Sequence, residues 1–447
     1  MCNIPLIVYL GKNLSEYGQQ TADRRTFTTL INQHFPLKEL KGHKAACNNQ
    51  TDKLLKYHGS YLRTKIIATD GNRHKVTIHR FYCPSCRATW SVYPTILVPG
   101  KHYDSYVIQN NLEDSLSHDL TYRSIIRQQT RLTSSGQAQA NAVQNARTPW
   151  HWVNWLGQFA LPLVLLACGL TPPVYAVEDE KFLKQNGEKS YTIGLVDQRY
   201  DVVWWLDYVF ATNQQTLEPS LRTLCRYLKH HPAWQSFKGI TVDSWSATKN
   251  AFLAICPDTK LAECLLHPLL KFEEEVRRYA RYTNAPAELI ALLKEAFTSV
   301  VFADCQADFE EGLAELETSP EFAHPILADR LKSLRRKQAG LTLHFSDPNL
   351  ALTSNPIDRI FKRLERKFSS MQQFRTDKSG KATLNAWAIV YNFRRFGIGA
   401  KRFGQSPVEL AGIDLQGLPW LQFILIHLSK VRWLKSANFD FHNLLGL

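Results

Sequence analysis

A run of short apolar segments between residues 174 and 243 constrains the fold of this 447-residue chain more than any other feature. The segments VYAVED, SYTIGLVD and DVVWWLDYVF each have the length of a buried strand, and polar turns separate them. An amphipathic segment, LEPSLRTLCRYLKHH, follows, and then one more strand-like segment, GITVD. Three strands, a helix and a further strand predict an α/β domain built on a mixed sheet.

Residues 272–339 change to helix-like patterning. The segments FEEEVRRYARY, AELIALLKEAF and HPILADRLKSLRRKQ carry apolar residues at helical spacing within dense charge. They predict an all-helical insertion in the α/β region. A basic amphipathic helix is predicted over residues 353–374, where Ser-Asn-Pro provides a typical helix start.

Charge is distributed unevenly along the chain, whose formal net charge is +14. Residues 1–150 carry +10, residues 151–345 carry −4 and residues 346–447 carry +8. A basic excess of this size favours a polyanionic partner, and nucleic acid is the commonest one. Basic solvated surface without a partner is the alternative.

The cysteine content and the apolar segments indicate the cellular compartment of the protein. Nine cysteines are too few for a disulfide scaffold, and their odd number favours a reducing compartment. The first residues, MCNIPLIVYLGKN, lack the basic start and the cleavage site of a signal peptide. The most apolar window, residues 159–170, is shorter than the roughly twenty residues that span a membrane, and Pro162 interrupts it. We therefore expect a cytoplasmic protein that does not associate with membranes.

Three aspartates are candidate ligands for Mg²⁺ or Mn²⁺. Asp179 is predicted to end one strand, Asp243 to end another, and Asp358 to open the basic helix. Carboxylates at the ends of adjacent strands converge at one edge of a sheet, and hard divalent cations prefer such oxygen ligands. Two ions held in this way activate a water or a 3′-hydroxyl at a phosphodiester. Taken singly, each aspartate is better explained as a turn residue, so the prediction depends on their combination.

A Cys-x2-Cys turn, Cys83-Pro84-Ser85-Cys86, directly follows a predicted strand. Such a turn offers two thiolates to a structural Zn²⁺, which requires four ligands. Cys47 is the third candidate and His43 the fourth. Other candidates for the fourth ligand are His58, His74 and His79. Two reduced cysteines in a strand turn are the alternative.

Residues 101–170 are predicted to be helical, with a polar loop or linker at 133–146. Thr148 and Pro149 form a typical N-cap and N1 pair, after which Trp152, Trp155 and Phe159 share one face. A helix-turn-helix presents such a helix to the DNA major groove. A helical spacer is the alternative, because no diagnostic turn is present.

Several blocks of the sequence resemble DDE transposases of prokaryotic insertion sequences, which have a ribonuclease-H-like catalytic domain. The blocks similar to the three catalytic segments of that family are VEDEKFLKQNGEKSYTIGLVDQ, GITVDSWSATKNAFLAICPDTKLAECLLHPLLKF and TSNPIDRIFKRLERKFSSMQQF, and WAIVYNFRRFG resembles the segment after them. HGSYLR, HRFYCPSC and TWSVYPTILVPG are similar to the zinc-ribbon segment that precedes the family's helix-turn-helix. The resemblance implies that Asp179, Asp243 and Asp358 are catalytic. It also implies cleavage and strand transfer of double-stranded DNA at terminal repeats and target sites by a homo-oligomer associated with the nucleoid.

The chain departs from the family pattern at two places. The last carboxylate is usually Glu but is Asp358 here, which makes Glu365, two helical turns further on, a substitute candidate. Family members usually carry two cysteines where this chain has only Cys47. A third feature, the Cys-x2-His of the second block, is interpreted as packing: Cys264 and His267 have helical spacing and no second pair nearby.

These patterns predict four regions. They are a zinc-ribbon-like domain at 1–100, a helix-turn-helix-like DNA-binding region at 101–170, a ribonuclease-H-like catalytic domain at 171–400 with its insertion at 272–339, and a C-terminal helical tail at 401–447. The function expected is that of a DDE transposase. A catalytically inactive, transposase-derived DNA-binding protein and a structure-specific nuclease on the same fold are the alternatives.

Overall fold

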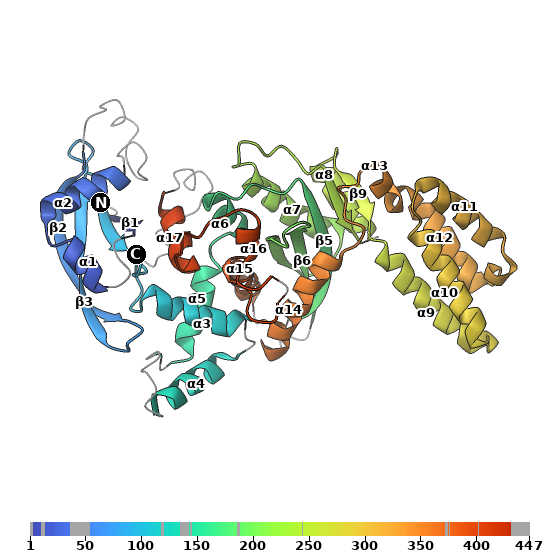
Figure 1. The fold of residues 1–447 in the computed structure, drawn as a ribbon, viewed down its shortest axis with the longest axis horizontal. Helices are drawn as coiled ribbons and strands as arrows, with labels where there is room; N and C mark the ends of the chain where they lie inside the picture. Colours follow the sequence, from blue (N-terminus) through green and yellow to red (C-terminus); the bar gives the residue numbers. More distant parts are fainter. Residues whose placement is uncertain are drawn as a thin grey trace. The chain divides into compact units, whose positions relative to one another are not determined.

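The computed structural model is of mixed α/β class, as predicted, and divides into two compact units (Figure 1). Unit 1 comprises Met1–Thr171 and Arg366–Leu447, and unit 2 comprises Pro172–Glu365. Each unit contains one sheet. The structure describes residues 3–9, 14–35, 54–117, 120–134, 143, 145–185, 188–243, 245–371, 374, 376–400 and 402–430.

The sheet of unit 2 has the strand order β7-β6-β5-β8-β9. Its strands are β5 (Tyr175–Gln185), β6 (Glu188–Asp197), β7 (Val203–Val209), β8 (Gly239–Val242) and β9 (Lys260–Glu263). The first three are antiparallel, and β8 and β9 continue the sheet parallel to β5. The crossovers are α7 (Gln214–Leu228) and α8 (Ser246–Ile255). β9 was not predicted, because a strand of four residues without an apolar run has no recognisable hydrophobic pattern.

Asp179 and Asp243, which were both predicted to end strands, have different positions. Asp243 directly follows β8, as predicted. Asp179 lies inside β5, not at its end, which corrects the prediction. The reason is that β6 pairs with β5 as far as Gln185, well beyond the last pair of β5 with β8, Val177 and Thr241.

Four helices that follow β9 in the sequence form a bundle with its own core (Figure 1). They are α9 (Leu266–Thr283), α10 (Ala287–Val301), α11 (Gln306–Thr318) and α12 (Pro325–Leu341), followed by the short α13 (Leu343–Ser346). The rings of Phe272 and Phe297 stack with centroids 3.9 Å apart at the centre of this core. The bundle occupies the position predicted for the helical insertion.

The helix α14 (Asn355–Met371) lies close against the unit 2 sheet at Gly194. A β-carbon on Gly194 would lie 2.6 Å from Cδ1 of Ile357 and 3.0 Å from Cζ of Phe361. Carbon atoms in contact are normally about 3.5–4.0 Å apart, so this approach requires glycine at position 194.

The sheet of unit 1 has the order β1-β4-β3-β2, in which only β1 and β4 are parallel. Its strands are β1 (Asn3–Val8), β2 (Lys56–Ile67), β3 (Arg73–Tyr82) and β4 (Thr89–Pro94). The helices α1 (Leu14–Gln20) and α2 (Arg24–His34) precede β2. The hydroxyl of Tyr17 in α1 donates to the carbonyl of Thr77 in β3 at 2.8 Å, which fixes α1 to the sheet.

The segment predicted to be helical contains α3 (Ser105–Ser117), α4 (Tyr122–Ser134), α5 (Arg147–Leu156) and α6 (Leu161–Ala167). The predicted N-cap and N1 pair, Thr148 and Pro149, lies two residues too late, because the helix begins at Arg147 and its N-cap position is Ala146. Asn145 Oδ1 accepts the amide of Arg147 at 2.9 Å just before this start. Trp152, Trp155 and Phe159 are buried, as their spacing predicted. Within the described residues, no helix combines the length and the apolar character needed to cross a membrane.

The C-terminal segment belongs to unit 1, which corrects the predicted catalytic domain of 171–400. In α15 (Asp377–Phe393), Ala382 lies very close to Gly157. A β-carbon on Gly157 would be 1.8 Å from the carbonyl oxygen of Ala382. In α17 (Trp420–Lys430), the Trp420 indole donates to Glu113 at 2.7 Å. The predicted tail at 401–447 therefore includes a buried helix, and residues 431–447 lie outside the described residues.

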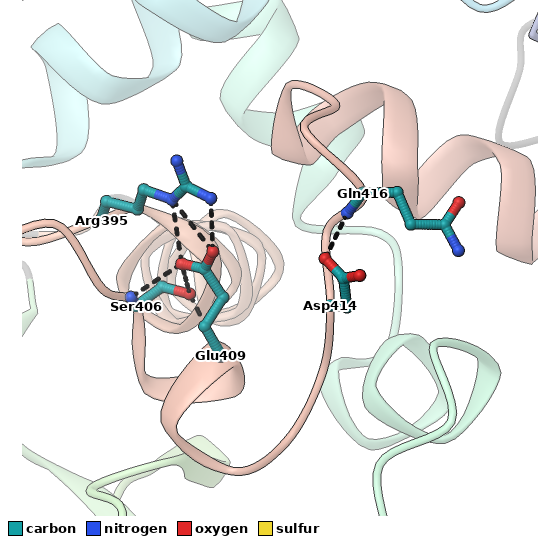
Figure 2. Close-up of polar contacts among 5 residues, drawn as sticks. All are labelled: Arg395, Ser406, Glu409, Asp414 and Gln416. Atoms are coloured by element: carbon teal, nitrogen blue, oxygen red, sulfur yellow. Dashed lines mark hydrogen bonds and ion pairs between the residues drawn. The ribbon is translucent and has the colours of Figure 1, made fainter.

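A capped turn lies between α15 and α17 in the sequence (Figure 2). In α16 (Pro407–Leu410), Ser406 and Glu409 form a reciprocal capping box, in which the Ser406 amide donates to Glu409 at 3.0 Å. The guanidinium of Arg395 donates to both carboxylate oxygens of Glu409. One carboxylate thus connects the end of α15 to the start of α16.

Candidate metal centre

Two neighbouring parallel strands bring the first two predicted aspartates together. Val177 of β5 pairs with Thr241 of β8, and continuing this register by two residues brings Asp179 beside Asp243. Adjacent strands lie about 4.8 Å apart, so both carboxylates reach one volume. Asp179 pairs with Gly194 on the other side, which puts its side chain on the sheet face that α14 covers.

His267 joins these two aspartates. One ligand atom from each of Asp179, Asp243 and His267 lies within 4.8 Å of the other two. His267 stands in the first turn of α9, which begins three residues after β9 ends. The spacing of His267 predicted a packing role, whereas its imidazole lies beside the carboxylates of Asp179 and Asp243.

Cys264 connects β9 to the start of α14. The β8–β9 register pairs Val242 with Glu263, so the next position brings Cys264 beside Asp243. The Cys264 thiol accepts the amide of Ser354 at 3.2 Å and lies 3.4 Å from the Ser354 hydroxyl. That hydroxyl donates to Asp358 Oδ2 at 3.4 Å. Cys264 is thus a positioning residue between the sheet and the third predicted aspartate.

The two candidates for the third carboxylate have different environments. The Asp358 carboxylate lies near enough to raise the pKa of Asp179. Glu365 instead forms an ion pair with Lys181 at 2.8 Å, and its side chain is 46% exposed. Asp358, and not Glu365, is therefore the carboxylate of α14 that acts on the Asp179–Asp243 pair.

Burial makes the carboxyl groups of β5 costly to ionise. It raises the pKa of Asp179 to about 7, against the effect of His267, and Asp243 and Asp358 add to the increase. Burial also raises the pKa of Glu180 to about 7, although the Thr248 hydroxyl donates to it. The imidazole of His267 has a raised pKa because of the Cys264 thiol, against burial, with further contributions from both aspartates. Excess negative charge concentrated in this way favours a bound cation.

Glu178 lies on the opposite face of β5 from Asp179. Its side chain is fully buried, and neither carboxyl oxygen has a hydrogen-bond partner among the described residues. Burial raises its pKa well above the usual range, and the carboxylates of Glu180, Asp179 and Asp243 raise it further. The environment of Glu178 therefore disfavours its ionised form.

The donor set fits a divalent cation. Carboxylate oxygens suit Mg²⁺ and Mn²⁺, and Mn²⁺ also accepts an imidazole nitrogen. Asp179, Asp243 and His267 would hold the ion. Asp358 of α14 is near enough for its charge to act on Asp179. Cations held in this way activate a water or hydroxyl and stabilise charge at a phosphoryl group.

The Cys-x2-Cys turn forms a tight loop between β3 and β4. The amide of Arg87 donates to the Cys83 carbonyl at 2.9 Å, and the Cys83 amide donates to the Ala88 carbonyl at 3.0 Å. Cys83 is buried and Cys86 is half-buried. Cys47 and His43, the other predicted zinc ligands, lie outside the described residues.

The three alternative histidines have other neighbours. His74 pairs with Asp70 at 2.9 Å, and His79 contacts the rings of Phe27 and Tyr57. His58 lies against the ring of Tyr82. In the described part of the chain, no cluster of three ligand side chains includes Cys83 or Cys86. The zinc ribbon therefore stays a prediction that depends on Cys47 and His43.

Comparison with known families finds one match. A family model described as a domain of unknown function (DUF6431) matches residues 46–130. No curated protein matches the chain. The matched span runs from the segment before β2 through the Cys-x2-Cys turn into α4. It crosses residue 100, where the first two predicted regions were divided, and both regions lie in unit 1.

Proposed function

We propose that this chain is a metal-dependent DDE transposase, in which unit 2 is a ribonuclease-H-like catalytic unit. The observation that carries the proposal is the cluster of Asp179, Asp243 and His267. Asp358 of α14 supports it, because its charge raises the pKa of Asp179. A sheet of three antiparallel strands continued by two parallel ones supports the same fold. The net charges of +10 over residues 1–150 and +8 over residues 346–447 support double-stranded DNA as the partner.

In the proposed reaction the chain's own residues fix the reacting geometry. Asp179 has little freedom to move because it lies inside a paired strand. Asp243 accepts the amide of Trp245 at 2.6 Å, which orients its carboxylate at the strand end. Asp358 depends on α14, which the Cys264–Ser354 contacts and the Gly194 approach hold against the sheet. Divalent cations, when bound, would activate the attacking water or 3′-hydroxyl and stabilise the leaving oxygen.

His267 has a positioning and ligating role in this proposal. The Cys264 thiol raises the pKa of its imidazole, with further contributions from Asp179 and Asp243, and this favours the protonated ring. A divalent cation would bind only the neutral imidazole, because only that form has a lone pair for the metal. The same site would thus exchange a proton for a metal ion before chemistry begins.

Cleavage of the element's own end DNA tests the proposal. The full chain is incubated with a labelled duplex carrying the inverted repeats that flank its reading frame, with and without Mg²⁺ or Mn²⁺. We expect metal-dependent nicking and joining of the 3′-hydroxyl to target DNA. Asp179→Asn, Asp243→Asn and Asp358→Asn should abolish both steps and leave DNA binding intact, whereas Glu365→Gln should remain active.

The outcomes separate the alternatives. A wild-type chain that binds the end DNA but never cleaves it is the inactive, transposase-derived DNA-binding protein. Cleavage without strand joining, on branched as well as linear DNA, indicates a structure-specific nuclease. A chain that neither binds nor cleaves DNA refutes the transposase and both alternatives. Association with the nucleoid and oligomerisation on DNA are parts of the proposal that the same binding assays examine.

A further inference from the structure

A second feature of unit 2 is a cationic pocket in the helical bundle, between α9, α10 and α12. Its polar lining consists of Lys271, Arg330, Ser333 and Lys337, over apolar side chains that include Phe297 and Leu334. No carboxylate is among the lining residues. Three cations thus face a single pocket without an acidic residue between them.

The cations of this pocket are poorly compensated. The Nε of Arg330 is buried and has no hydrogen-bond partner among the described residues. Burying a charged donor without a partner is unfavourable, unless a ligand supplies the acceptor. The Nζ of Lys337 lies 3.7 Å from Glu263, whose other carboxylate oxygen already accepts from Lys249 at 2.6 Å. One glutamate therefore serves two lysines, and Arg330 and Lys271 form no ion pair with any described residue.

The surroundings of Lys337 disfavour its charged form. Burial lowers its pKa, and the charges of Lys271 and Lys249 lower it further, against Glu263 and Asp243. An anion in the pocket would remove this cost by pairing with all three lining cations. Arginine offers a planar set of donors to phosphate, lysine contributes a point charge, and the Ser333 hydroxyl adds a neutral donor.

The pocket is close to the candidate metal centre. Gly340 of α12 lies against Glu263, where a β-carbon would be 2.8 Å from Cγ of Glu263. This contact brings Lys337, one helical turn earlier, to the end of β9. The charge of Asp243 reaches Lys337, so an anion held here would lie within electrostatic range of the metal ligands.

We propose that Lys271, Arg330, Ser333 and Lys337 bind a backbone phosphate of the DNA that is cut at the metal centre. The proposal rests on the proposed function for the identity of the ligand. It assigns the helical bundle a role in substrate binding, because the bundle supplies all four side chains.

The salt dependence of DNA binding tests this pocket. The full chain with Asp179→Asn, which prevents cleavage, is titrated against a fluorescein-labelled duplex of the element end at several NaCl concentrations. Each phosphate contact contributes about −0.9 to the slope of log K against log salt concentration. We expect the double variant Lys271→Gln/Arg330→Gln to reduce the magnitude of the slope by about 1. Lys332→Gln is the matched control, because Lys332 is on the same helix with a side chain that is 74% exposed, and it should leave the slope unchanged.

A second measurement separates the pocket from the proposed function. Inorganic phosphate should raise the Tm of the wild-type chain and should not raise that of the double variant. Arg330→Lys, which keeps the charge and the fold, should retain part of the effect. If the wild-type chain binds no DNA but phosphate stabilises it through these residues, the proposed function fails and the anion pocket stands. If the double variant matches the wild type in both salt slope and phosphate response, the pocket proposal is wrong.

Discussion

Replacing Gly194 with alanine tests whether the close approach of α14 to the sheet holds Asp358 in place. The new β-carbon would lie 2.6 Å from Cδ1 of Ile357, roughly 1 Å closer than carbon atoms normally approach. Phe361 and Leu206 are the next neighbours, at 3.0 and 3.2 Å, so the methyl group has little room in other directions. We therefore expect α14 to move outward.

The expected cost follows from overpacking. Inserting a methyl group into a packed core costs about 1–3 kcal/mol. For a unit of this size, each kcal/mol lowers the Tm by about 2–4 °C. Because Asp358 directly follows Ile357, the same outward movement carries its carboxylate away from Asp179. A displacement of about 1 Å at a reacting group can reduce the rate about 100-fold, so cleavage should fall by more than stability.

Thermal unfolding and the metal-dependent cleavage assay measure the two effects. Ile357→Val removes Cδ1, the atom that the new methyl group meets, so the double variant should recover both Tm and cleavage relative to Gly194→Ala alone. Gly397→Ala is the control, because a β-carbon there meets nothing within 4 Å. Two results would contradict the proposed role of the close approach of α14 at Gly194. One is a Gly194→Ala chain that melts and cleaves like the wild type, and the other is a double variant that recovers neither property.

Four further predictions concern the two units. Burial raises the pKa of Asp179 to about 7, so its contribution to the stability of the metal-free protein is complete near pH 4 and lost as the pH rises through 7. The Tm of the metal-free protein should therefore fall over this pH range, and Mn²⁺ should reverse the fall. A Tm that rises with pH would contradict the raised pKa of Asp179. His267→Gln should weaken Mn²⁺ binding by calorimetry about 10–100-fold, and unchanged affinity would exclude His267 as a ligand. Cys83→Ser should remove about one equivalent of zinc from the full chain by metal analysis, which a zinc-free wild type would disprove. Arg395→Gln should cost less than about 1 kcal/mol in urea unfolding, because the guanidinium is exposed, and a loss of several kcal/mol would be inconsistent with that ion pair.

The strands of unit 2 could be predicted because their burial leaves short apolar runs between polar turns. β7 is buried at every position and its sequence, VWWLDYV, is continuously apolar around one Asp. The full length of β5 could not be predicted, since its second half carries charge and is kept in the sheet by pairing with β6. β9 gave too little pattern because its sequence, KLAE, has four residues and two charges.

His267, the third member of the candidate metal centre, could not be assigned for a different reason. His267 and Cys264 are three residues apart, a spacing that helical packing explains equally well. Their role depends on the register that aligns Cys264 with Asp243, which is a property of paired strands and not of local sequence. The resemblance to the second catalytic block contained the signal, because that block includes the same Cys-x2-His pair.

No local sequence pattern predicts that the C-terminal segment belongs to unit 1. Residues 377–393 dock on α5 because Gly157 leaves room for the backbone of Ala382. A glycine in one part of the chain and an alanine more than two hundred residues later carry no shared pattern that a single sequence reveals. Contacts of this kind are visible only once the chain has folded.

The arrangement of the three aspartates along the chain determines when the centre can be completed during synthesis. Asp179 and Asp243 belong to the sheet, but Asp358 follows the entire helical bundle and emerges 115 residues after Asp243. At about 5–20 residues per second, a ribosome needs roughly 6–23 s to cover that distance. The bundle has its own core and can fold in the meantime, which shortens the effective loop that α14 must close. A nascent chain therefore carries an incomplete centre until nearly all of unit 2 has been made, and the proposed cleavage activity could not begin while the sheet is still folding.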